Sequence, residues 1–149
     1  MKAKVLIVLL IGVITIYACK KTSTTDRPTL TFKNVNDTVF SQNKQIIFDF
    51  DFTHKTTQEI TDTLVIKEVF FNCNPVTDSF PLPVYTVVAN QKNALEYKYT
   101  YGSGGVYNGC LNSNGNPVTD SVYYYFWLKD KYGNVSDTVR SPKIILLSQ

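Results

Sequence analysis

The sequence predicts an all-β domain, a Greek-key β-sandwich of about seven short strands, and three observations support this prediction. From residue 29 onward the chain is rich in Thr, Val, Ile, Tyr and Phe, which are enriched in strands. Two segments alternate apolar and polar side chains with a period of two residues, as expected when one face is buried and the other is in water. Turn-forming residues separate the segments at short intervals.

Three strands are predicted in the first half of the domain. Residues 31–35 and 63–71 are short β-prone runs bounded by turn-forming residues. Residues 46–53 show the clearest pattern, because large apolar side chains occupy every even position and mostly polar ones the odd positions. We therefore expect this segment to bury one face against a core.

Four more strands are predicted in the second half. Residues 83–89 form a short β-prone run, and residues 95–101 repeat the alternating pattern. Residues 122–129 are apolar on both faces, which indicates the central strand of a sheet. Residues 138–147 contain Pro142, which should split that strand because proline cannot donate to a ladder.

The first 18 residues have the layout of an export signal. Two lysines precede an apolar run from Val5 to Ile16, which is shorter than the roughly 20 residues that a membrane-spanning helix needs. The tetrapeptide Ile16 to Cys19, IYAC, resembles the lipobox of bacterial lipoproteins, with Ile16 where the family usually has Leu. The resemblance implies cleavage after residue 18, a diacylglycerol on the Cys19 thiol and acylation of the new amine. The alternative is an ordinary secretory signal in which Cys19 is incidental.

The expected organisation has three parts: a signal peptide at residues 1–18, a flexible polar tether at 19–28 and one domain at 29–149. The signal peptide carries two of the 15 basic residues, so 13 remain against 12 acidic ones. Because the lysines are scattered singly, no nucleic-acid partner is expected. The predicted contact with a membrane is the N-terminal lipid.

Two further cysteines, Cys73 and Cys110, follow Cys19. In an oxidising cell envelope they predict a disulfide, which would contribute about 3 to 4 kcal/mol in the chain-entropy model. Two separate thiols are the alternative. No metal or other cofactor is expected, because neither cysteine has a second ligand close in sequence and the sole histidine is His54.

Two stretches resemble a known family. IIFDFDF at residues 46–52 and VYYYFWLKDKYGNVSDTVRSPKIIL at 122–146 resemble the immunoglobulin-like domains of small lipoproteins common in Bacteroidetes. The resemblance covers about 110 residues and implies an Ig-like or fibronectin-III-like sandwich, a statement about fold more than function. Such relatives often carry an acidic, glycine-rich turn after the Phe-rich strand. Thr-His-Lys-Thr-Thr at residues 53–57 replaces that turn here, so the resemblance does not carry a cation site over to this chain.

A triplet of Asp, then Ser or Thr, then an aliphatic residue occurs four times. It resembles the O-glycosylation sequon of Bacteroidetes envelope proteins, which implies glycans on Thr38, Thr63, Ser121 and Thr138. The alternative is local, since Asp commonly ends a turn and a β-branched residue commonly begins a strand.

Seven aromatic residues form a candidate contact surface. They would offer a carbohydrate or a peptide a large area with few rotatable bonds, or they would instead pack in the core. The set is Tyr97, Tyr99, Tyr101, Tyr107, Tyr123, Tyr125 and Trp127. Tyr107, in a glycine-rich loop, is the residue most expected to contact a ligand.

The sequence predicts a protein without catalytic residues. It has one histidine and neither a Gly-x-Ser-x-Gly nor a His-Glu-x-x-His motif, so general acid-base chemistry lacks its usual groups. We expect an outer-membrane lipoprotein whose domain is a binding module for an envelope protein or a glycan. The alternative is a structural accessory subunit of an outer-membrane complex. The leaflet is undecided, because Lys20 and Lys21 stand where surface-exposed relatives tend to carry acidic residues.

Overall fold

The computed structural model describes residues 27–102 and 109–148, and these residues form only strands, turns and irregular segments. The predicted all-β class is confirmed. The described residues contain eleven strands rather than about seven, because several pairings involve only two or three residues. No helix long and apolar enough to cross a membrane occurs in this part of the chain. The signal peptide, Cys19 and Tyr107 lie outside the described residues.

The first sheet is antiparallel and has three strands, with β3 between β1 and β8. Their bounds are Thr29–Val35 for β1, Gln45–Thr53 for β3 and Asn93–Thr100 for β8. The predicted alternation in β3 is confirmed: its even-numbered residues are buried and its odd-numbered ones face out. Since β3 has neighbours on both sides, it is the central strand of this sheet.

The second sheet has the order β2-β11-β9-β5-β6, and β10 also pairs with β9. The bounds are Val39–Phe40 (β2), Thr63–Phe70 (β5), Val76–Pro81 (β6), Asp120–Lys129 (β9), Val139–Arg140 (β10) and Ile144–Leu146 (β11). β9 is the central strand of this sheet, as the two apolar faces of residues 122–129 predict. Pro142 separates β10 from β11, as expected.

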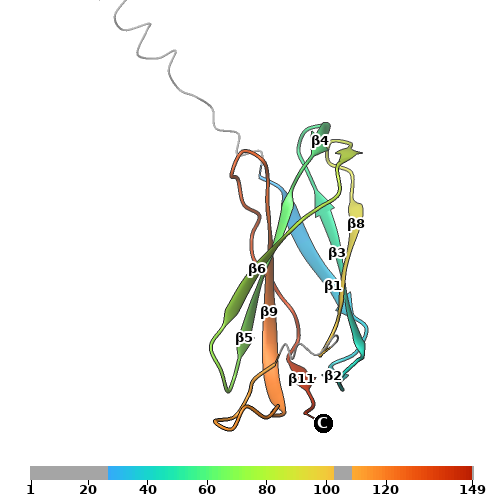
Figure 1. The fold of residues 1–149 in the computed structure, drawn as a ribbon. Coiled ribbons are helices and arrows are strands. Elements are labelled where there is room, and N and C mark those ends of the chain that lie inside the picture. The colour runs from blue at the N-terminus through green and yellow to red at the C-terminus, as the bar shows by residue number, and fades with distance from the viewer. Residues whose placement is uncertain (1–26, 103–108, 149) are drawn as a thin grey trace, which may run out of the picture.

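A small two-stranded sheet joins β4 (Gln58–Ile60) to β7 (Tyr85–Val87) at one end of the molecule (Figure 1). β7 is shorter than the run predicted at 83–89. The sequence patterns did not reveal β2, β4 or β6. β2 and β4 are too short to show a period, and β6 contains Asp, Ser and Pro, which have low strand propensity.

The core lies between the two large sheets, which pack face to face in the manner of a β-sandwich (Figure 1). Aromatic rings from β3 and β9 meet there. The ring centroids of Phe48 and Phe50 lie 4.9 Å and 4.8 Å from that of Phe126, and Phe48 also lies 5.0 Å from Tyr124. All four side chains are at most 1% exposed, so each contributes roughly 1.5 to 3 kcal/mol of hydrophobic stabilisation.

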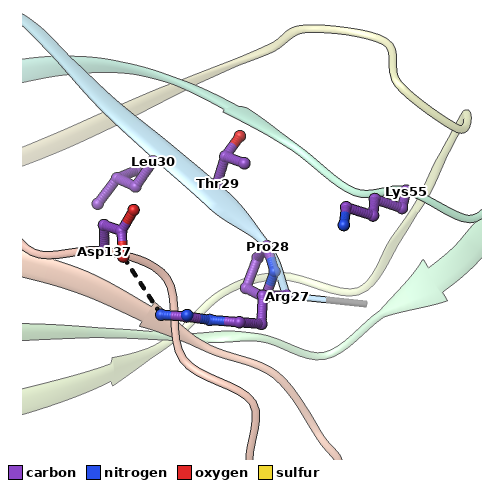
Figure 2. Close-up of a pocket in the computed structure, with 6 residues that line it drawn as sticks. All are labelled: Arg27, Pro28, Thr29, Leu30, Lys55 and Asp137. Carbon is purple, nitrogen blue, oxygen red and sulfur yellow. Dashed lines mark hydrogen bonds and ion pairs between the residues drawn. The ribbon is translucent and has the colours of Figure 1, made fainter. Parts of the chain in front are cut away.

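The chain enters the domain at Arg27, beside the connection from β9 to β10 (Figure 2). The Arg27 Nε donates to the Val135 carbonyl at 2.9 Å, and its Nη2 pairs with Asp137 Oδ1 at 3.2 Å. Because the Asp137 side chain is 95% exposed, this ion pair contributes no more than about 1 kcal/mol. The final residues of the predicted tether thus contact the domain.

Candidate functional site

The best candidate site lies on the outer face of β9. Tyr123, Tyr125 and Trp127, here called the aromatic row, alternate along this strand with side chains that point into the core. All three are partly exposed, whereas the intervening Tyr124 and Phe126 are fully buried. The aromatic row therefore places three large rings on a face that no other described strand covers.

Strand register determines which residues surround the aromatic row. Directly paired residues of neighbouring strands share a face. Val65 pairs with Trp127, Lys67 with Tyr125, and Arg140 with Tyr125 from the other side. A hollow of about 340 Å³ opens on this face, here called the outer hollow, and it is lined by Lys67, Val69, Tyr125, Trp127 and Thr138. One open depression thus combines two aromatic rings, a lysine and a threonine.

Cations stack on the neighbouring rings. The Arg140 guanidinium lies 4.7 Å from the ring centroid of Tyr123, and the Lys143 Nζ lies 5.2 Å from that of Phe71. Phe71 and Tyr123 in turn contact each other with centroids 5.8 Å apart. Because Arg140 occupies one side of Tyr123, the rings most available at the outer hollow are those of Tyr125 and Trp127.

The outer face of the second sheet is positively charged. Its outward positions are Val39, Thr63, Val65, Lys67, Val69, Thr77, Ser79, Pro81, Ser121, Tyr123, Tyr125, Trp127, Lys129, Arg140 and Ile145. Three of these strand residues are cations and none is an acid. Such a surface can stack against the flat, weakly polar face of a ring and attract an anion at the same time.

Six of the seven aromatic residues proposed from sequence lie in the described part of the chain, and they fall into two groups. Tyr97 and Tyr99 pack against the core and Tyr101 is fully buried, as the packing interpretation predicts. The aromatic row faces outward, as the surface interpretation predicts. The signal that separates the groups is the position of each residue within its strand, together with the strand's place in the sheet.

An acid lies on the inner side of the same sheet. Glu68 pairs in register with Tyr124, so it faces the space between the sheets. Burial, together with the charge of Asp78, raises the pKa of Glu68 to about 7. Burial also raises the pKa of Tyr97 to about 12, with Glu68 and Asp78 adding to the effect. Sequence patterns gave no sign of this acid, because it breaks the apolar period of β5.

His54 belongs to a buried hydrogen-bonded group. Its Nε2 lies 2.8 Å from Asp62 Oδ2, and Gln58 Nε2 lies 3.1 Å from its Nδ1. Because the Gln58 Nε2 can only donate, the His54 Nδ1 accepts, and the His54 Nε2 carries the proton that it donates to Asp62. Burial raises the pKa of Asp62, while the hydrogen bond from His54 lowers it. Both ring nitrogens are thus engaged in holding the connections on either side of β4.

The predicted disulfide between Cys73 and Cys110 is present, with a Cα–Cα distance of 5.7 Å. Asp120 Oδ2 lies 2.7 Å from Cys110 Sγ, a packing contact because a disulfide sulfur has no hydrogen to donate. The Asp120 carboxylate accepts from the Asn72 backbone and side chain at 3.1 Å and 2.8 Å. The two sulfurs and this carboxylate cluster closely, but the joined sulfurs offer no thiolate to a metal.

The acids of the four triplets have different environments. Asp62 and Asp120 are 1% and 3% exposed and hold the contacts described above, which is what the turn-into-strand interpretation predicts for them. Asp37 is exposed and its Oδ1 accepts from the backbone of Thr38 at 2.6 Å and of Val39 at 3.2 Å. Asp137 is exposed as well.

The four hydroxyl residues differ in the same way. Thr38 and Thr138 are exposed, whereas Thr63 and Ser121 are partly buried on the outer face of the second sheet. A folded domain therefore presents the triplets at Thr38 and Thr138 more openly than the other two, and Thr138 lines the outer hollow.

Comparisons with known proteins show resemblance at the level of fold alone. No protein-family model and no curated protein matches the chain. Among solved structures, a β-glucosidase from Listeria innocua is similar with a TM-score of 0.51 and 7% identity over 82% of this chain. The alkylpurine DNA glycosylase AlkC from Pseudomonas fluorescens has a TM-score of 0.50 and 11% identity over 82% of this chain.

The chain spans only part of each of these proteins, 16% of the β-glucosidase and 31% of the glycosylase. It spans 50% of the sporulation control protein Spo0M from Bacillus subtilis, at 7% identity and a TM-score of 0.48. Identities this low carry no residue roles from one protein to another, so function must be argued from this chain's own surface.

Proposed function

We propose that the chain is a lipid-anchored outer-membrane lipoprotein whose Ig-like, Greek-key domain is a non-catalytic binding module. The lipobox-like Ile16 to Cys19 supports the anchor, and the two packed, mainly antiparallel sheets support the fold. The observation that carries the binding role is the outer hollow, an open depression with aromatic and cationic residues on an otherwise regular sheet face. Partly exposed aromatic surface of this kind is typical of interaction sites.

Anchoring at Cys19 would fix how the domain stands on the membrane. Eight peptide units join Cys19 to Arg27, and fully extended they reach at most about 28 Å. The end of the domain that bears Arg27 therefore stays near the lipid surface. β9 ends beside the Arg27 end of the domain, where Lys129 pairs with Val135, and it begins at Asp120, which contacts the disulfide. Figure 1 shows β9 running along the length of the sandwich. The aromatic row on this strand would therefore run outward from the membrane side.

An accessory role in a larger outer-membrane complex is favoured by a different observation. β6 is the edge strand of the second sheet, and all six of its residues are exposed. Val76 and Phe80 are 46% and 38% exposed there. An edge strand with free backbone groups and apolar side chains is suited to pairing with a strand of a partner protein.

The anchor is tested by mass spectrometry of the protein purified from membranes of an expressing bacterium. We expect the mature chain to begin at Cys19 with acyl groups on its sulfur and its amine. A Cys19→Ala variant should leave the membrane fraction or keep its signal peptide. Retention of Met1, or an unmodified sulfur at position 19, contradicts the proposal.

The binding role is distinguished from the accessory role by co-purification with two variants. Tyr125→Ala alters the outer hollow, and Val76→Lys places a charge on the β6 edge, where it opposes strand pairing. A binding module loses its ligand in the first variant and keeps it in the second. The reverse result, loss of a stoichiometric partner only in Val76→Lys, favours the accessory role.

A further inference from the structure

We propose that the outer hollow binds an acidic polysaccharide, with sugar rings stacked on Tyr125 and Trp127 and carboxylates bound by Lys67 and Arg140. This inference rests on the proposed function, because it names the ligand class of the binding module. It uses three observations: the aromatic row, the pairing of β9 with strands on both sides, and the placement of charge around the outer hollow.

The pairing of β9 argues against a peptide as the ligand. β9 has β5 on one side and β10 and β11 on the other, so most of its backbone donors and acceptors are already used. A peptide that binds in extended form gains affinity by adding backbone hydrogen bonds at a sheet edge. The face of a paired sheet offers only side chains, and here the exposed ones are rings and cations.

A sugar chain matches what these side chains offer. A pyranose ring has a face of C–H groups, which packs on an aromatic ring, and an edge of hydroxyl groups that remain in water. Tyr125 and Trp127 are two residues apart on one strand, which separates them by about 6.8 Å along β9. A linear polysaccharide lying along β9 would thus meet successive rings, with the Thr138 hydroxyl beside it.

The charges indicate that this sugar chain is acidic. Lys67 and Arg140 pair in register with Tyr125 from opposite sides, on strands about 4.8 Å away, so both side chains share the face of that ring. The Arg140 guanidinium lies over the neighbouring Tyr123 ring, at the border of the outer hollow. Two acids are adjacent in sequence to residues that line the outer hollow: Glu68, which faces the space between the sheets, and Asp137, which pairs with Arg27. Carboxylates on both edges of a polyuronate would therefore find a cation on either side.

The test uses Trp127, the only tryptophan of the chain, whose fluorescence reports this site directly. The lipoprotein purified in detergent is titrated with three polymers: polygalacturonate, which has rings and carboxylates; dextran, which has neutral rings; and polyglutamate, which has carboxylates without rings. We expect a saturable change with polygalacturonate that weakens as salt is raised, because the ion pairs are solvent-exposed. Dextran and polyglutamate should each bind at least about tenfold more weakly than polygalacturonate.

Two pairs of variants, measured by affinity electrophoresis, locate the binding. Tyr125→Ala and Lys67→Gln should each weaken polygalacturonate binding about tenfold. Their matched controls are Tyr132→Ala and Lys131→Gln, a second aromatic and lysine pair whose Nζ lies 5.1 Å from the ring, on the β9 to β10 connection. The controls should change binding less than about twofold. Thermal unfolding curves verify that each variant is folded.

Several results would overturn the inference. Equal binding of dextran removes the role of charge, and equal binding of polyglutamate removes the role of the rings. Loss in the control variants places binding elsewhere, and no binding of polygalacturonate rejects the ligand class. The last result leaves the proposed function standing if Cys19 is lipidated and a partner is lost in Tyr125→Ala. An unmodified Cys19 counts against the proposed function instead.

Discussion

The two faces of β9 have nearly the same apolar character but different surroundings. On the inner face, Val122, Tyr124, Phe126 and Leu128 are fully buried. On the outer face, the aromatic row remains partly exposed. The inner face meets the Phe side chains of β3, whereas no described strand packs over the outer face. What an apolar residue contributes therefore depends on the layer opposite it, which its own sequence does not specify.

The outer face has partial cover of another kind. Val65 and Val69 flank the aromatic row from β5, and Arg140 stacks on Tyr123. Such contacts shield rings from water at their edges but do not remove them from it. The inner face therefore stabilises the fold, whereas the rings of the outer face stay partly in contact with water.

Replacement of Phe126 by Ala should have the largest effect. The change removes a ring that contacts Phe48, Phe50 and Tyr124, and leaves a cavity between the sheets. We expect the free energy of unfolding to fall by about 3 to 5 kcal/mol. Urea denaturation followed by circular dichroism measures it. The matched control is Tyr125→Ala, the adjacent outward residue, and equal losses in the two variants would contradict the distinction between the faces.

Glu68→Gln should have a smaller effect that depends on pH. The pKa of Glu68 is raised from an ordinary value of 4.5 to about 7, so the folded state holds the proton more tightly than the unfolded state. The wild-type contribution is therefore fully present below about pH 4.5 and is lost as pH rises to about 7. Glutamine stays neutral and avoids this loss. We expect the variant to be more stable at pH 8, by on the order of 1 to 3 kcal/mol, and little changed at pH 4.5.

Thermal unfolding of both proteins at pH 4.5 and pH 8 measures the difference. Glu96→Gln is the control, because Glu96 lies on β8 with its carboxylate 50% exposed and 3.0 Å from the Lys98 Nζ. A gain in stability of the same size at both pH values would show that packing of the amide, rather than loss of the charge, is responsible.

The long strands could be predicted from sequence because their side chains have a clear period. β3 and β8 alternate, and β9 is apolar on both faces, and each pattern predicted a strand where one occurs. For β9 the pattern also predicted its central place in the sheet. β6 could not be predicted, because as an edge strand with six exposed residues it has no buried face to impose a period. The additional pairings of two or three residues depend on tertiary packing.

The candidate site was only partly predictable. The disulfide could be predicted from the number of cysteines and the expected oxidising compartment. Two cysteines allow only one pairing, whatever their spacing in the sequence. The outer hollow could not be predicted from the sequence, because Lys67, Trp127 and Thr138 come from three segments that only strand pairing brings together. The structural roles of Asp62 and Asp120 were also hidden, because their partners His54 and Asn72 lie 8 and 48 residues away. Cys19 and Tyr107 lie outside the described residues, so their roles remain predictions.

The smallest effect on stability is expected from Arg140→Gln on the outer face. The variant removes a cation that stacks on Tyr123 at 4.7 Å, and such contacts at exposed sites contribute about 0.5 to 1 kcal/mol. Urea denaturation should therefore show a loss within that range, far below the loss for Phe126→Ala. Binding of polygalacturonate should nevertheless fall about tenfold, because a flanking charge is gone. If stability instead fell by more than about 2 kcal/mol, Arg140 would be serving the fold and the functional assignment of the outer face would fail.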